Sequence, residues 1–113
     1  MVVKQEVEKL VSINSQEAYR NLLAGIKKEK WDIIYKEKEY LEVFGITSML
    51  GGSTLLSLAT EAARYVPFFV RIFSQGKKSR ILIIAAGSEN WLGWDFGRNK
   101  KVAEKILNMC LDK

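Results

Sequence analysis

The stretch of sequence that decides the fold spans residues 68–86 and reads FFVRIFSQGKKSRILIIAA. Its first part, Phe68–Phe73, is apolar except for Arg71, and its last part, Arg80–Ala86, is apolar on both faces of an extended chain. The polar residues Gln75–Lys78 between them are typical of a turn. The pattern predicts two antiparallel strands, and we expect the second to lie centrally in a sheet because both of its faces are apolar.

A second hairpin is indicated upstream of this stretch. Its two strands are predicted where apolar and polar side chains alternate, and the charged residues Lys36-Glu37-Lys38-Glu39 between them are typical of a solvated turn. The alternating positions are Trp31, Ile33 and Tyr35 against Asp32, Ile34 and Lys36, then Leu41 and Val43 against Tyr40, Glu42 and Phe44. Glu6–Ile13 is interpreted as a further strand, although Val3, Val7, Leu10 and Val11 also fit a helical period.

Two helices are predicted from apolar stripes. The first begins at Ser15, expected to be its N-cap, and ends near Lys28, with Glu17 at the positive end of the helix. The second spans Arg98–Leu111. Ser53–Tyr65 is either a short helix capped by Ser53 or a loop.

This order of elements predicts one domain over residues 1–113, an α+β two-layer sandwich with an antiparallel sheet of about five strands and two main helices on one face. The strand, helix, four strands, helix order resembles a repeat of the TATA-binding protein or a shortened helix-grip domain. That resemblance rests on element order and implies nothing about DNA binding.

The C-terminal third carries a second resemblance. The strand Arg80–Ala86, a short linker, the motif Asp95-Phe96-Gly97-Arg98-Asn99-Lys100-Lys101 and an amphipathic helix follow one another. This ending is similar to that of a group of small uncharacterised prokaryotic proteins. The resemblance implies the fold and gives no activity.

Composition excludes several classes of function. The chain has 113 residues, no histidine and one cysteine, Cys110. These counts exclude an internal disulfide and catalysis by histidine, and they argue against the usual zinc sites. We expect Cys110, on the apolar stripe of the last helix, to be buried and inert. No pair of catalytic groups is recognisable, so we expect neither an enzyme nor a cofactor or bound metal.

The setting of the protein also follows from composition. The segment Met1–Leu10 is too charged for a signal peptide, and the uncharged stretch Gly45–Thr60 is too short to span a membrane. We therefore expect a cytoplasmic protein, with a Lys- and Glu-rich composition like that of thermophiles. The net charge of +5 permits binding to nucleic acid without requiring it.

The loop before the last helix is the candidate binding site. It combines aromatic residues, glycines and cations, and its ligand- or anion-binding candidates are Trp91, Trp94, Arg98, Asn99, Lys100 and Lys101. Either the aromatic rings plug the core and Asp95 caps the helix, or the Trp side chains stay exposed beside the cations. Gly51–Thr54 is a second anion-site candidate, because free N–H groups at a helix start point outward, but we favour its interpretation as a flexible loop followed by a helix cap.

The sequence thus predicts a non-enzymatic binding or assembly module, which either self-associates or holds a small apolar ligand. Self-association is expected through Leu50–Leu58 and the Phe68-Phe69 strand, because this part of the chain is rich in large apolar side chains. The alternative is a nucleic-acid-binding domain that uses the basic aromatic loop, residues 91–101.

Overall fold

The structure, a computed structural model, describes residues 5–47, 66–86 and 98–111. In these ranges the chain forms five strands and two helices. They are β1 (Gln5–Val11), α1 (Ser15–Lys28), β2 (Asp32–Glu37), β3 (Glu42–Ile46), β4 (Pro67–Gln75), β5 (Lys78–Ala85) and α4 (Arg98–Leu111). The alternative helical interpretation of the first segment is therefore wrong, since β1 is a strand, and the predicted helix or loop at Ser53–Tyr65 lies outside the described residues.

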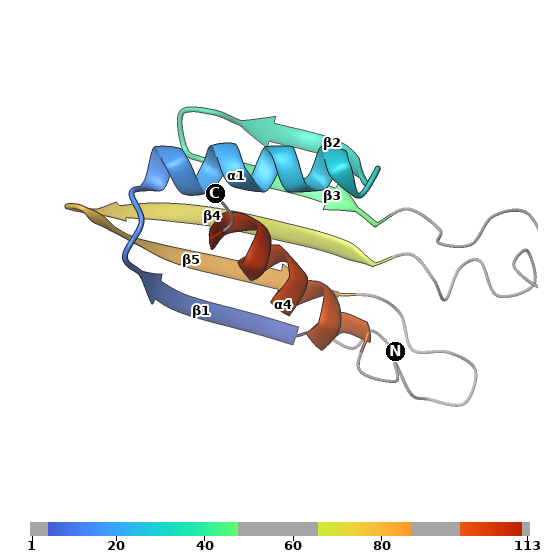
Figure 1. Cartoon of the computed structure of the whole chain (residues 1–113). Coiled ribbons are helices and arrows are strands. Elements are labelled where there is room, and N and C mark those ends of the chain that lie inside the picture. Colours follow the sequence, from blue (N-terminus) through green and yellow to red (C-terminus); the bar gives the residue numbers. More distant parts are fainter. Residues whose placement is uncertain (1–4, 48–65, 87–97, 112–113) are drawn as a thin grey trace, which may run out of the picture.

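The strands form one antiparallel sheet in the order β1-β5-β4-β3-β2. Both helices lie on the same face of the sheet, where α1 and α4 also pack against each other (Figure 1). The predicted α+β sandwich, with five strands and two helices on one face, is confirmed. The predicted central position of β5 is confirmed as well, because β5 lies between β1 and β4.

The core fills the space between the sheet and the two helices. Alternate residues of β4 and β5 point toward the helices and are almost completely buried, as are the facing residues of α1 and α4. The central members of this core are Leu22, Ile26, Val43, Phe68, Val70, Ile81, Ile83 and Ile106. The rings of Trp31 and Phe68 pack within this core at a tilt, with their centroids 5.5 Å apart.

The turn between β4 and β5 forms at the residues where the sequence predicts it. Gln75 pairs with Lys78 across a two-residue connection in which Gly76 has a φ of 66°. This left-handed conformation favours glycine because a side chain there is strained. The predicted turn at Gln75–Lys78 is confirmed.

The start of α1 differs from the prediction by one residue. Asn14, not Ser15, is the N-cap: its side-chain oxygen accepts a hydrogen bond of 2.8 Å from the main-chain N–H of Glu17. Ser15 is the first helical residue and is buried. Both residue types cap helices well, and the chain uses the one whose backbone is extended.

The strand β2 departs from the strict alternation that the sequence predicts. Its register to β3 shifts between Ile33 and Tyr35, which marks a β-bulge at Ile34. Ile33 pairs with Gly45 on the helix-covered face, whereas Tyr35 pairs with Phe44 on the opposite face. The predicted hairpin is confirmed, but the grouping of Ile33 and Tyr35 on one face is wrong because the bulge changes the phase.

Candidate functional site

The sheet has an outer face that neither α1 nor α4 covers (Figure 1). On this face the strand register places four large apolar side chains in one row across β2, β3, β4 and β5: Tyr35, Phe44, Phe69 and Ile84. Tyr35 is 50% exposed and Phe44 38% exposed, while Phe69 and Ile84 are half-buried. We call these four residues the aromatic row.

The charged side chains beside the aromatic row pair with one another. Arg71 Nε lies 3.6 Å from a carboxylate oxygen of Glu42, and Arg80 Nε lies 3.2 Å from one of Glu8. Both guanidinium groups also lie 4.8 Å from the ring centroid of Phe73. The outer face therefore combines an exposed apolar row with cations that already have carboxylate and aromatic partners.

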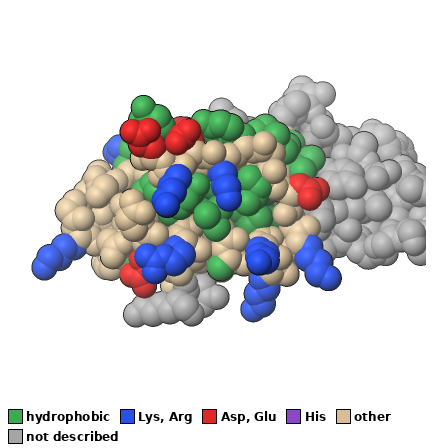
Figure 2. Space-filling model, turned by 90° about the horizontal axis from the view of Figure 1, so that it is seen from above, with side chains coloured by type: hydrophobic (Ala, Val, Ile, Leu, Met, Phe, Trp, Pro, Cys, Tyr) green, Lys and Arg blue, Asp and Glu red, His purple; other side chains and the backbone are tan. Residues whose placement is uncertain are grey.

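A groove separates the first half of α1 from the end of β2. Figure 2 shows this side of the molecule: hydrophobic side chains lie in its middle, Lys and Arg side chains lie over and around them, and Asp or Glu side chains lie near its border. The groove has a volume of about 320 Å³. It is lined by Gln16, Tyr19, Arg20, Leu23, Lys36 and Lys38.

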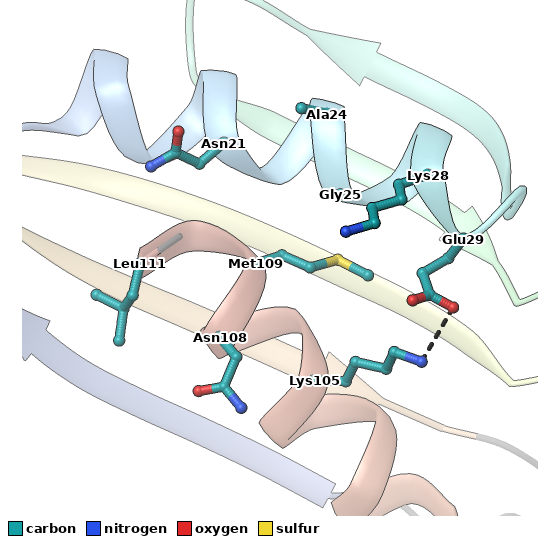
Figure 3. Close-up of a pocket in the computed structure, with 9 residues that line it drawn as sticks. All are labelled: Asn21, Ala24, Gly25, Lys28, Glu29, Lys105, Asn108, Met109 and Leu111. Carbon is teal, nitrogen blue, oxygen red and sulfur yellow. Dashed lines mark ion pairs between the residues drawn. The ribbon is translucent and has the colours of Figure 1, made fainter. Parts of the chain in front are cut away.

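A larger groove of about 510 Å³ runs between α1 and α4 (Figure 3). Its floor includes Gly25 and Met109, and a Cβ at Gly25 would lie 2.6 Å from Met109 Cγ, so glycine allows the two helices to approach closely. On its rim, Lys105 Nζ lies 3.0 Å from a carboxylate oxygen of Glu29. The Asn21 amide donates a 3.1 Å hydrogen bond to the main-chain oxygen of Cys110. These contacts join the helices, and we interpret the groove as the seam of the helix layer.

The residues predicted from the C-terminal loop are only partly described. Trp91 and Trp94 lie outside the described residues, and Arg98 begins α4. Asn99 is 1% exposed, whereas Lys100 and Lys101 are exposed on the first turn of α4. Asn99 is therefore buried inside the protein, while the two lysines are accessible to solvent. Because Trp91 and Trp94 lie outside the described residues, the binding site at this loop stays a prediction.

The buried thiol behaves as expected for a structural cysteine. Cys110 is 0% exposed, and burial raises its pKa to about 12. The predicted burial of Cys110 is confirmed. A nucleophilic cysteine needs exposure and a lowered pKa, so the raised pKa supports the expectation of an inert thiol. Among residues 5–47, 66–86 and 98–111, no three His, Cys, Asp or Glu side chains are grouped to hold a metal ion, and no helix is long and apolar enough to cross a membrane.

Comparison with known proteins gives a fold and no family. No protein-family model and no curated protein matches the sequence. Among solved structures, the chain is similar to Ara h 8.0201 with a TM-score of 0.66 and 10% identity, over 97% of this chain and 95% of that one. It also matches the Zhui aromatase/cyclase from Streptomyces sp. R1128, with a TM-score of 0.45 and 12% identity over 98% and 92% of the two chains. At these identities only the first likeness bears on this protein, and it shows the fold alone.

Sequence reasoning missed the aromatic row as a site. Phe44 and Phe69 were visible as members of alternating strands, but the alternation does not say which face the helices cover. The register decides this: Phe68 is buried beneath the helices, and its neighbour Phe69 lies on the outer face. The predicted self-association surface included Phe68, Phe69 and Leu50–Leu58. Phe69 is partly exposed and can take part in a contact, whereas Phe68 is buried. Leu50–Leu58 lies outside the described residues.

Proposed function

We propose that the protein is a non-enzymatic assembly module that self-associates through the outer face of its sheet. The observation that carries this proposal is the aromatic row, Tyr35, Phe44, Phe69 and Ile84, on the face opposite the helices. Apolar side chains gathered on one surface favour contact with another apolar surface, because the contact removes them from water.

A second copy of the chain suits this face for two reasons. The pairs Arg71–Glu42 and Arg80–Glu8 satisfy charges within one copy, so these residues do not call for a charged partner. Two identical faces also place an apolar row against an apolar row, and sheets pack face to face with their strands within about 30° of each other.

Association through β2, the last strand of the described sheet, is less well supported than association through the face. Ile34 is 60% exposed at this edge, but it lies at the bulge. Bulges interrupt the regular backbone pairing on which edge-to-edge association depends. We therefore place the contact on the face, where the register is regular from β3 to β5.

A small apolar ligand held between sheet and helices, the other form of this function, has weaker support among the described residues. Leu22, Ile83 and Ile106 are each 0% exposed and occupy the space between the layers. An apolar ligand at this depth would have to displace well-packed side chains, which costs free energy.

Light scattering on a concentration series of the full chain tests the proposal. The wild-type chain should reach the mass of a dimer or a larger species, and the Tyr35→Thr/Phe44→Thr variant should be monomeric at the same concentrations. Ile33→Thr is the matched control, since it removes an exposed β-branched residue of the same strand from the helix-covered face instead of the outer face. A monomeric wild type would exclude the proposal, and dissociation by Ile33→Thr alone would move the contact away from the outer face.

A further inference from the structure

The groove between α1 and β2 has a chemical character that the proposed assembly does not use. We infer that it binds a small organic anion with an apolar body, such as an aryl or short alkyl carboxylate. The groove opens on the helix side of β2, because Lys36 pairs in register with Val43, whose side chain is buried toward the helices. It is therefore a site separate from the aromatic row on the outer face.

The floor of the groove is apolar with one hydroxyl. Tyr19 is 5% exposed, and Leu23 is half-buried against the core. The Tyr19 hydroxyl donates to the main-chain oxygen of Glu42 over 3.4 Å, a long distance for an O–H donor. Burial, and then the nearby Glu37 and Tyr35, raise the pKa of Tyr19, so the hydroxyl is protonated at neutral pH. To donate to a bound oxyanion, the hydroxyl would give up its long hydrogen bond to Glu42.

The rim of the groove is cationic. Arg20 comes from α1, while Lys36 and Lys38 come from the end of β2 and the turn after it. Within the described part of the chain, none of these three cations lies within 4.0 Å of a carboxylate oxygen. They differ in this from Arg71, Arg80 and Lys105, each of which has a carboxylate partner.

The carboxylate of Glu37 lies near the groove without lining it. Glu37 pairs in register with Glu42 on the outer face of the sheet, its carboxylate accepts a 3.2 Å hydrogen bond from the main-chain N–H of Glu39, and its charge helps to raise the pKa of Tyr19. Among the residues that the structure describes, no carboxylate lines the groove. Three positively charged side chains around an apolar floor attract an anion and repel a cation.

The size of the groove limits the ligand. A volume of about 320 Å³ lies at the lower end of the range of small-molecule sites. An aromatic ring with a short acidic side chain fits this scale: the ring would lie against Tyr19 and Leu23, and the acid would lie among the cations.

Protein-observed NMR on the ¹⁵N-labelled full chain tests the inference, with 4-phenylbutyrate as probe and its neutral amide as the matched control ligand. The carboxylate should shift the amide resonances of residues 16–23 and 36–38, and the neutral amide should bind more weakly by about fivefold or more. Lys36→Gln/Lys38→Gln should weaken carboxylate binding by about fivefold or more, the loss expected when two exposed charge contacts are removed. The same spectra show whether the variant is folded.

Lys9→Gln/Lys78→Gln is the matched control variant, because it removes the same charge from exposed residues of β1 and β5, on the side of the sheet away from β2. It should change carboxylate binding by less than about twofold, as expected for screened, distant charges. Equal binding of the two ligands, an equal loss in both variants, or resonance shifts confined to other surfaces would each overturn the inference.

Discussion

Gly45 offers the sharpest test of how the sheet is packed. It lies in β3 on the helix-covered face, opposite Ile33 on one side and Phe68 on the other. A Cβ at this position would lie 2.5 Å from the main-chain oxygen of Asp32 and 2.7 Å from Cζ of Phe68. Neither atom can move away easily, because one belongs to the backbone of β2 and the other to a ring that is 1% exposed.

The size of the effect of Gly45→Ala follows from two opposing contributions. Overpacking a closed site costs about 1–3 kcal/mol. Replacing glycine by alanine also lowers the conformational entropy of the unfolded chain, which stabilises the folded protein by roughly 0.4–1 kcal/mol. We expect a net loss of about 1–2 kcal/mol in the free energy of unfolding, and about 4 °C or more in Tm for each kcal/mol in a domain of this size.

Urea unfolding followed by circular dichroism measures this loss. In Gly45→Ala/Phe68→Leu the ring atom is absent, so the double variant should lose less stability than the sum of the two single variants. Gly76→Ala is a contrasting control, because nothing lies within 4 Å of a Cβ at this position and its cost of about 1–2 kcal/mol comes from the positive φ alone. A Gly45→Ala protein as stable as the wild type would refute the packing described here.

Two further predictions concern Cys110 and the C-terminal loop. Burial raises the pKa of the Cys110 thiol from 9.0 to about 12, so the unfolded state releases this proton first and stability should fall from about pH 9 to pH 12. Between about pH 9 and pH 12, the midpoint of urea unfolding should fall more steeply with pH in the wild type than in Cys110→Ala. Equal slopes in the two proteins would contradict a raised pKa of Cys110. If the loop binds nucleic acid, Lys100→Ala/Lys101→Ala should weaken binding of short oligonucleotides and flatten its salt dependence, measured by quenching of Trp fluorescence. No quenching of the wild type at low salt would exclude this alternative.

The hairpin of β4 and β5 could be predicted from sequence because local signals agree there. Both strands alternate or are apolar throughout, and Gly76 supplies the left-handed turn residue between them. The helices were predictable for the same reason, since their apolar stripes repeat with the period of a helix. The one-residue error at the start of α1 arose because Asn14 and Ser15 have equivalent capping chemistry.

The candidate surfaces could not be predicted in the same way, because they depend on contacts between distant residues. The bulge at Ile34 is set by pairing with β3 and changes which side chains of β2 face the helices. The groove brings Arg20 together with Lys36 and Lys38, whose proximity depends on how α1 packs beside β2. The charged turn at Lys36–Glu39 was predicted from sequence, but nothing in its sequence indicated that Lys36 and Lys38 line a groove together with residues of α1.

Contacts between two copies of the chain test the central claim most directly. In an equimolar mixture of isotope-labelled and unlabelled protein, filtered NOE spectra detect only contacts between different copies. Self-association through the outer face predicts intermolecular signals between the rings of Tyr35, Phe44 or Phe69 and the methyl groups of Leu82 and Ile84. Intermolecular signals that come only from α1 and α4, or none at concentrations where light scattering shows a dimer, would contradict the account.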